Sequence, residues 1–324
     1  MKKWQKKYNA MNILSDKQIQ LIQKEISADE YYDLYFKLRE KDEKSILGKM
    51  SLKTRQRLHK LMLFIFTVNN KLGGYSYEIL NDKHIETKRA VIYAVTHIGK
   101  FDVEIISEAI RKHYYLLSGD YEHLQGIIDG KFLMINGVFF FNESIKEDRK
   151  RVSERMVEHL QVGGNIMYFP EGAWNLSPNL PMLPCYWGIV DAARKGNAII
   201  IPIAADQYGK HFKINIGSDI DMSEYGNSAE EKTRAINDLR DTLATLKWEI
   251  WETEHEKREN INASYWDNYV KKRLDEWTYY GIEYINSLIY KPKGIIGNDE
   301  AFVHLNTLTP NINNAFLFSK RNHD

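Results

Sequence analysis

Residues 90–102 read AVIYAVTHIGKFD and carry the strongest structural signal in the chain. The first six form a continuous apolar run rich in β-branched residues, which is typical of a strand buried on both faces of a sheet. His97 follows this run, and Gly99 offers a residue at which the chain can turn sharply. A helix is expected over residues 101–112. A strand, a turn and a helix in this order form the repeating unit of a parallel α/β sheet.

The same alternation continues along the chain. Because the predicted strands are separated by helices, we expect a mostly parallel central sheet covered by helices on both faces. After the helix at 101–112, strands are expected at 113–117, 137–141, 165–169, 198–204 and 212–216, and helices at 146–160 and 188–195.

The regions on either side are expected to be helical extensions. Residues 15–44 read as two polar helices, the first starting at Ser15 and Asp16 and the second at Ser27. Long helices are expected at 229–258 and 264–289, and the aromatic residues of the second favour core packing. The predicted organisation is therefore an N-terminal extension at 1–87, a core at 88–222 and a C-terminal extension at 223–324.

Composition narrows the class of protein. The 324 residues are 43% hydrophobic and 27% charged, as in a globular protein, and the formal net charge of +1 gives no protein-wide field for nucleic acid. The single cysteine, Cys185, excludes an intramolecular disulfide, fits a reducing compartment and is expected to be a packed, unreactive thiol. The basic start at 1–7 lacks the apolar region of a signal peptide, and the longest apolar run, 61–66, is too short to span a bilayer. A cytoplasmic protein is expected, with peripheral membrane contact at most.

One region could make such contact. Residues 51–72 begin with basic side chains, continue with apolar ones and contain no acidic residue. A helix of this kind could lie on an anionic membrane surface. For a cytoplasmic protein this surface would be the inner face of the membrane. The alternative is a helix that packs on the catalytic core and keeps its basic residues in water. The sequence favours neither interpretation.

His97 and Asp102 are the first candidates for catalysis. On a continuous helix they would lie about 140° apart, so they can meet only across a turn. With His97 at the strand end and Asp102 in the first helical turn, the carboxylate could fix the imidazole tautomer and raise the basicity of the free nitrogen. The sequence contains no G-x-S-x-G nucleophile motif. Such a pair could instead activate an external hydroxyl against an electrophile that is already reactive, such as a thioester.

A second motif, YFPEG at residues 168–172, also follows an expected strand. Pro170 ends strand pairing because it has no N–H, and Gly172 permits a tight turn. Glu171 would then project at the carboxyl edge of the sheet, where α/β proteins usually bind ligands.

Four blocks in this order resemble the glycerolipid acyltransferase superfamily of the lysophosphatidic acid acyltransferase type. The resemblance spans roughly residues 88–217. The blocks are the His97–Asp102 motif, GVFFFNE at 137–143, FPEG at 169–172, and IIIPI at 199–203.

The resemblance implies a fold, an activity and a set of site residues. The fold would be similar to that of glycerol-3-phosphate acyltransferase, and His97 would be the general base with Asp102 as its partner. The second and third blocks would shape the acceptor site, and the fourth would support the acyl pocket. N–H groups around the turn at 97–99 are candidates to stabilise an oxyanion. The implied substrate-binding residues are Gly99, Lys100, Gly137, Asn142, Phe169, Pro170, Glu171, Gly172, Trp174 and Pro202.

Two positions depart from the family pattern. The second block ordinarily ends in arginine, where this chain has Glu143, and the arginine that commonly follows FPEG is replaced by Trp174. Those arginines are associated with the acceptor's phosphate, and neither replacement can reproduce a bidentate guanidinium contact. A sugar, polyol or other non-phosphorylated hydroxyl is therefore the expected acceptor. Lys100, Arg149 and Arg151 remain alternative phosphate contacts.

The predicted function is acyl transfer from acyl-CoA or acyl carrier protein, as co-substrate, to an acceptor hydroxyl in phospholipid or glycolipid biosynthesis. Two alternatives stay open: a non-catalytic module that binds lipid or a membrane surface, and a thioester hydrolase. No cofactor is expected. A metal site is not expected either, because His97 and Asp102 give two ligands at most, while His113 and His123 lie on separate predicted segments. No nucleic-acid partner is expected.

Overall fold

The computed structural model describes residues 13–99, 101–175 and 180–253, together with Ser264 and Asn268. Within these residues seven strands form one sheet in the order β1-β7-β6-β2-β5-β3-β4. Strands β6, β2, β5, β3 and β4 are parallel, whereas β7 is antiparallel to β6 and pairs in parallel with β1. The strands are β1 (Ser76–Asp82), β2 (Val91–Val95), β3 (Tyr115–Ser118), β4 (Val138–Phe140), β5 (Ile166–Tyr168), β6 (Ile199–Tyr208) and β7 (His211–Ile216).

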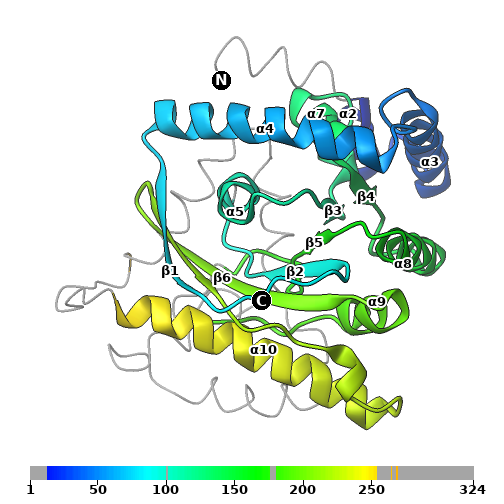
Figure 1. Cartoon of the computed structure of the whole chain (residues 1–324). Coiled ribbons are helices and arrows are strands. Elements are labelled where there is room, and N and C mark those ends of the chain that lie inside the picture. The colour runs from blue at the N-terminus through cyan, green and yellow to red at the C-terminus, as the bar shows by residue number, and fades with distance from the viewer. Residues whose placement is uncertain (1–12, 100, 176–179, 254–263, 265–267, 269–324) are drawn as a thin grey trace.

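Helices cover both faces of this sheet, as Figure 1 shows. The α4 and α5 helices lie on one side, and α9 and α10 lie on the other. The helices are α2 (Ile13–Ile22), α3 (Ala28–Lys44), α4 (Leu52–Gly73), α5 (Asp102–Ile110), α6 (Tyr121–Leu124), α7 (Ile128–Asn136), α8 (Lys146–Gln161), α9 (Gly188–Gly196) and α10 (Ala229–Glu252).

Strand β2 explains why both faces are covered. All five of its residues are buried, and successive side chains point to opposite faces of the sheet. Val91, Tyr93 and Val95 join one core cluster, in which they pack with residues of α5. Ile92 and Ala94 join another cluster, which α8, α9 and α10 complete. The continuous apolar run in the sequence thus corresponds to a central strand with two cores, and the predicted fold class is confirmed.

Serine caps start three of the helices. The Ser27, Ser51 and Ser228 side chains accept hydrogen bonds from backbone N–H groups three residues ahead, which begins α3, α4 and α10. Ser15 and Asp16 do not start a helix as predicted, because α2 already contains them. The expected helix at 264–289 and the expected end at residue 258 lie outside the described residues.

The edge of the sheet differs most from the prediction. Residues 76–82 were assigned to a helical extension, but they form edge strand β1, which is mostly exposed and carries little hydrophobic pattern. Strand β6 runs on to Tyr208 and turns into β7 through Gly209 and Lys210, with Gly209 at a φ of +62°. A two-residue turn that begins with glycine favours a hairpin, so this signal was present in the sequence. Helices α6 and α7 were not predicted.

The N-terminal helices are attached to the core by a buried ion pair. Arg39 of α3 donates two hydrogen bonds of 2.6 Å to the Asp148 carboxylate in the first turn of α8. Both side chains are buried, and Asp148 also accepts a hydrogen bond from the Asn142 N–H. Such a pair fixes one geometry, because both charges need their partner in the absence of water. Among the described residues, no helix is long and apolar enough to cross a membrane.

Candidate active site

The turn after β2 brings His97 and Asp102 together. The imidazole Nδ1 lies 2.7 Å from Oδ2 of Asp102, which is the first residue of α5. An ionised carboxylate can only accept a hydrogen bond, so Nδ1 must donate the proton in this contact. Nε2 is then the basic nitrogen of the imidazole. Among the described residues no hydrogen bond uses Nε2, and the His97 side chain is 21% exposed, against 1% for Asp102. One nitrogen is therefore oriented and the other can reach a substrate.

Backbone groups fix the Asp102 carboxylate. Oδ2 also accepts hydrogen bonds from the N–H groups of Ile98 and Gly99, at 3.1 and 3.2 Å, and Oδ1 accepts one from Val103 at 2.8 Å. These three backbone hydrogen bonds orient the carboxylate. The N–H groups of Ile98 and Gly99 had been candidates to stabilise an oxyanion, but here they donate to Asp102. In this conformation those groups orient Asp102 instead.

The FPEG segment holds the main chain of His97 from both sides. The His97 N–H donates to Oε1 of Glu171 at 2.9 Å, and the Asn175 N–H donates to the His97 carbonyl at 2.6 Å. The second Glu171 oxygen accepts the Leu183 N–H at 2.8 Å. Because strands β2 and β5 are adjacent and parallel, their carboxyl ends meet and these contacts become possible. The two sequence motifs thus form one unit around His97.

Glu171 is buried, and this shifts its titration. The side chain is 1% exposed. Loss of water raises the pKa of Glu171 to about 7, although the two backbone N–H groups oppose the shift. The resemblance assigns Glu171 to the acceptor site, but the structure places both of its oxygens against the backbone. Here the residue positions His97 and the segment around Leu183.

Two aromatic rings enclose the imidazole. Phe169 stacks on His97 with ring centroids 4.1 Å apart and an interplanar angle of 22°. Trp174 meets His97 edge-on at 6.0 Å, and it is itself buried. The two rings restrict imidazole rotation and exclude water from its faces. Trp174 therefore lies beside the His97 imidazole, at the position where the family pattern commonly has arginine.

Comparison with known proteins agrees with this site. Residues 76–206, which run from β1 into β6 and include His97, Asp102 and Glu171, match the family model described as Acyltransferase. These residues form an acyltransferase domain. The resemblance inferred from the four blocks and the predicted enzyme class are therefore confirmed for this part of the chain. The match also begins at β1, which the sequence interpretation had left outside the core.

The crystal structure of the 1-acyl-sn-glycerophosphate acyltransferase PlsC from Thermotoga maritima is similar to this chain with a TM-score of 0.47 and 15% sequence identity. That similarity covers 70% of this chain and 90% of the PlsC chain. No curated protein gives a significant match.

The rest of the FPEG turn packs against Tyr186. Pro170 is buried, and its carbonyl accepts the Tyr186 N–H at 2.9 Å. Gly172 has a φ of +64°, and a Cβ at this position would meet the Tyr186 ring at 2.6 Å. Glycine is thus required here both by the backbone angle and by the close ring. Tyr186 is 58% exposed and had not been singled out in the sequence.

The remaining predicted residues are spread over the sheet. Gly137 precedes β4, so it lies at the amino edge of the parallel strands, opposite His97, and a Cβ there would enter the Tyr115 ring. Asn142 follows β4 at the same edge as His97, but β5 and β3 lie between β4 and β2. Pro202 is buried inside β6 opposite Ala94. These three positions support the fold, and Lys100 lies outside the described residues.

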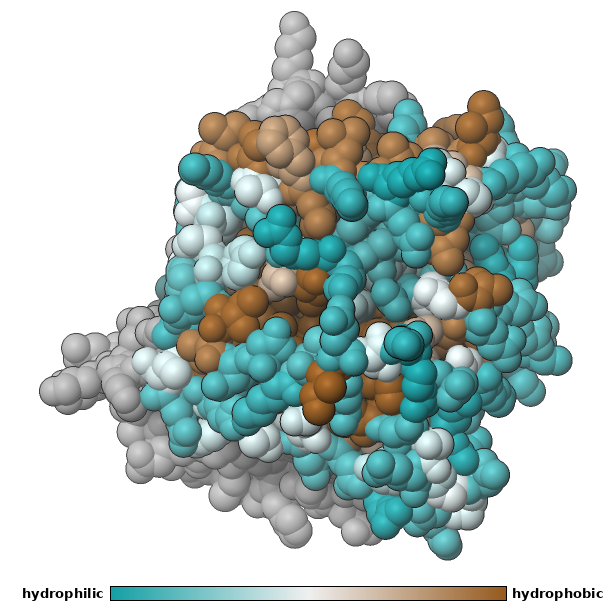
Figure 2. All heavy atoms as spheres, in the orientation of Figure 1, coloured by the Kyte–Doolittle hydropathy of each residue, from teal (hydrophilic) through white to brown (hydrophobic). Residues whose placement is uncertain are grey.

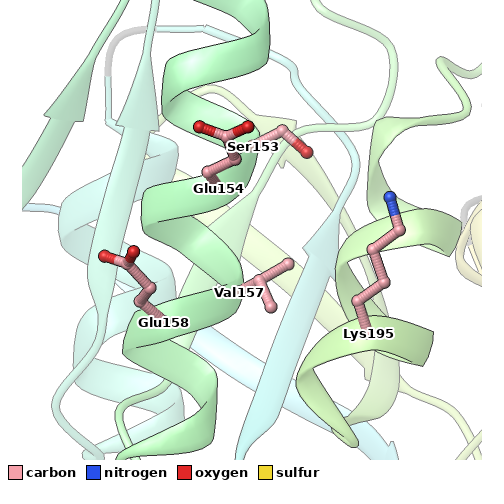
Figure 3. Close-up of a pocket in the computed structure, with 5 residues that line it drawn as sticks. All are labelled: Ser153, Glu154, Val157, Glu158 and Lys195. Carbon is pink, nitrogen blue, oxygen red and sulfur yellow. The ribbon is translucent and has the colours of Figure 1, made fainter.

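The described residues were also searched for a metal site, a reactive cysteine and a separate pocket. They contain no group of three or more His, Cys, Asp or Glu side chains that could bind a metal ion. Burial raises the pKa of the Cys185 thiol, which keeps it protonated and a weak nucleophile. A hollow of about 240 Å³ is lined by Ser153, Glu154, Val157, Glu158 and Lys195 of α8 and α9. Figure 3 shows these side chains. The hollow shares no lining residue with the surroundings of His97.

Proposed function

We propose that this protein transfers an acyl group from a thioester donor, acyl-CoA or acyl carrier protein, to a hydroxyl group in lipid biosynthesis. The main support is the His97–Asp102 pair, whose Nδ1 and Oδ2 atoms are 2.7 Å apart. The pair lies within the acyltransferase domain, at the carboxyl edge of its sheet. The pair has the geometry of a general base and the group that orients it.

The reaction requires one proton carrier. Nε2 of His97 takes the proton of the acceptor hydroxyl while the oxygen attacks the thioester carbonyl. Asp102 stabilises the imidazolium that forms. When the tetrahedral intermediate collapses, the C–S bond breaks and the leaving thiolate receives the proton from His97. The products are an ester and a free thiol, and His97 returns to its neutral state.

No acyl-enzyme is needed in this scheme. A thioester is reactive enough for direct attack, whereas a covalent route would require an activated protein nucleophile. The protonated Cys185 thiol does not provide one. His97 therefore acts on the acceptor itself, and donor and acceptor must be bound together.

We further propose that the acceptor carries no phosphate next to the reacting hydroxyl. Glu143 is exposed. Burial raises the pKa of Tyr186, and the negative charge of Glu143 adds to this shift. The Tyr186 ring lies against Gly172 of the FPEG turn. A carboxylate at this rim repels a phosphate group. Trp174 offers an apolar edge instead of a cation. A sugar or polyol hydroxyl suits such a rim better than lysophosphatidic acid.

The first prediction concerns His97. Because its imidazole is the proposed base, His97→Ala should lower the rate of acyl transfer by about 100-fold or more. The assay incubates the protein with an acyl thioester and a panel of hydroxyl acceptors, and mass spectrometry identifies the esters. His84→Ala is the matched control, since His84 also pairs with an aspartate, Asp219, at 3.0 Å but lies elsewhere.

Three outcomes of this assay would contradict parts of the proposal. Full activity of His97→Ala would remove the base from the mechanism. Release of free fatty acid without ester formation would identify a thioester hydrolase instead. Efficient acylation of lysophosphatidic acid would overturn the inference drawn from Glu143 and Trp174.

A further inference from the structure

Two consecutive aromatic side chains are exposed beside the FPEG turn. Tyr186 and Trp187 directly precede α9, and their exposed fractions are 58% and 47%. Tryptophan is highly buried in most proteins, and hydrophilic side chains cover much of the face of this molecule that Figure 2 shows. We call Tyr186 and Trp187 the aromatic platform. Large rings exposed side by side are a candidate surface for a ligand.

The backbone of the platform is fixed although its side chains are exposed. The Tyr186 N–H donates to the Pro170 carbonyl at 2.9 Å, and the Trp187 carbonyl accepts the Val190 N–H at 3.0 Å in the first turn of α9. A Cβ on Gly172 would meet one edge of the Tyr186 ring at 2.6 Å. The platform is thus attached to the FPEG turn, and a ligand loses little affinity in ordering it.

The platform and His97 share one edge of the sheet. Gly172 follows Glu171, whose Oε1 accepts the His97 N–H at 2.9 Å. Phe169 of the same segment stacks on the His97 imidazole. Because α9 leads into β6, which is parallel to β2, α9 begins at the carboxyl edge, where β2 ends before His97. Open α/β sheets bind their ligands at this edge.

A carboxylate lies near the platform. Burial raises the pKa of Tyr186, and the negative charge of the exposed Glu143 adds to this shift, so the two side chains are neighbours. The Arg149 guanidinium donates to the main-chain carbonyl of Glu143. Among the described residues no hydrogen bond or ion pair uses the Glu143 carboxylate. It can therefore accept hydrogen bonds from a ligand.

Aromatic rings beside a carboxylate suit a sugar. The C–H groups on one face of a pyranose ring carry partial positive charge and pack on the electron-rich faces of aromatic rings, while its hydroxyls donate to a carboxylate. An adenine ring could also stack there, but coenzyme A carries phosphates that the Glu143 charge repels. A fatty acyl chain would gain nothing from the carboxylate. A sugar is the ligand that uses all of these groups.

We propose that Tyr186 and Trp187 form a platform on which a pyranose ring of the acceptor stacks, with Glu143 accepting hydrogen bonds from its hydroxyls. The platform holds the ring beside the FPEG turn, so that another hydroxyl of the sugar can face His97. This narrows the acceptor from any non-phosphorylated hydroxyl to a sugar ring. The role in acceptor choice rests on the proposed acyl transfer, whereas sugar binding itself does not.

Saturation-transfer NMR tests sugar binding without an activity assay. The full chain is mixed in separate samples with the methyl pyranosides of glucose, galactose and mannose, with glycerol, and with coenzyme A. We expect at least one pyranoside to bind, with transfer strongest to the C–H protons on one face of its ring. Glycerol should bind more weakly, because it offers hydroxyls but no ring face.

Three substitutions test the residues of the site. Trp187→Leu and Tyr186→Leu should each weaken pyranoside binding about fivefold, because leucine keeps an apolar side chain but has no aromatic face. Glu143→Gln should also weaken it about fivefold, because a neutral amide makes weaker hydrogen bonds than a carboxylate. Trp187→Phe keeps an aromatic face and should retain most of the binding.

Matched variants provide the controls. Trp248 is 54% exposed on α10, so Trp248→Leu should bind pyranosides like the parent. Thermal unfolding checks that the platform variants are folded. His97→Ala should bind the sugar like the parent while it loses ester formation. A parent that binds the sugar but forms no ester with any acceptor would refute the acyl transfer and leave the platform intact.

Three results would overturn the proposal. One is a parent protein that binds none of the pyranosides, or binds glycerol as tightly. Another is pyranoside binding that stays unchanged in Trp187→Leu and Tyr186→Leu. The third is coenzyme A that binds more tightly than every pyranoside and is lost in the same two variants, because the platform would then stack an adenine ring of the donor.

Discussion

His97 depends on residues far from it in sequence. Its imidazole is oriented by Asp102, but its main chain is held by the Glu171 carboxylate and the Asn175 N–H. In the proposed mechanism such positioning would matter, because a small displacement of His97 would lengthen the path of the proton. The glutamate of the FPEG motif therefore contacts the backbone of His97 and of Leu183 in this structure.

Burial of Glu171 gives a testable pH dependence. The pKa rises from 4.5 to about 7 on folding, so between these values the folded protein keeps a proton that the unfolded chain has released. The free energy of unfolding should consequently fall by about 3 kcal/mol through this group as the pH rises from 4.5 to 7.

Glu171→Gln isolates this contribution. Denaturant unfolding of the parent and the variant is measured from pH 5 to 8, and the stability of the parent relative to the variant should decrease as the pH rises. Glu158→Gln on the exposed side of α8 should show no such trend. A parent-to-variant difference that does not change with pH would mean that Glu171 is not a buried titrating group.

At the scale of elements, the Arg39–Asp148 pair attaches α3 to α8. It joins two segments that are more than a hundred residues apart, and the same Asp148 carboxylate orders the chain after β4 through the Asn142 N–H. The connection between the N-terminal helices and the domain thus depends on a buried charge that only Arg39 neutralises by direct contact among the described residues.

Removing Arg39 should be costly. Arg39→Met leaves Asp148 buried and unpaired, so the free energy of unfolding should fall by about 3–5 kcal/mol. Arg151→Met is the comparison, because Arg151 pairs with Glu43 at 2.9 Å with its side chain 55% exposed, and its loss should cost no more than about 1 kcal/mol. Denaturant unfolding at constant pH measures both changes. Equal losses of unfolding free energy in the two variants would show that the buried pair contributes no more to stability than the exposed one.

At the scale of the whole molecule, buried histidines should make the fold sensitive to acid. Burial lowers the pKa of His113 and of His159 to about 4, and the Arg55 charge nearby acts in the same direction on both. His59 lies against His113 with ring centroids 5.5 Å apart, and burial lowers its pKa as well. All three are therefore neutral in the folded protein at neutral pH.

Acid should weaken the fold through this cluster. Below pH 6.5 the unfolded chain binds protons that the folded protein takes up only near pH 4, so stability falls as the pH drops through this window. The loss should reach about 3 kcal/mol for each of His113 and His159. In His113→Gln/His159→Gln the slope of unfolding free energy against pH should be smaller than in the parent. Parallel slopes for the two proteins would contradict the prediction.

Much of the fold could be predicted because its signals are local. The apolar run at 91–95 predicted a central strand, since only a strand buried on both faces needs no polar alternation. Serine caps marked the starts of α3, α4 and α10. The edge strand β1 was missed because an exposed strand leaves little hydrophobic pattern. The antiparallel orientation of β7 was not predicted, because the glycine turn at Gly209 was not interpreted as a hairpin.

The sequence by itself determined the class of enzyme and singled out His97 and Asp102 as a candidate pair, because both follow from residue types and their order along a strand and a turn. Only the tertiary structure decided how these residues are used. It turned Glu171 toward the backbone of His97 and placed Gly137 at the opposite edge of the sheet. Such relations depend on which segments become neighbours when strands pair, and strand order is not encoded in any local pattern.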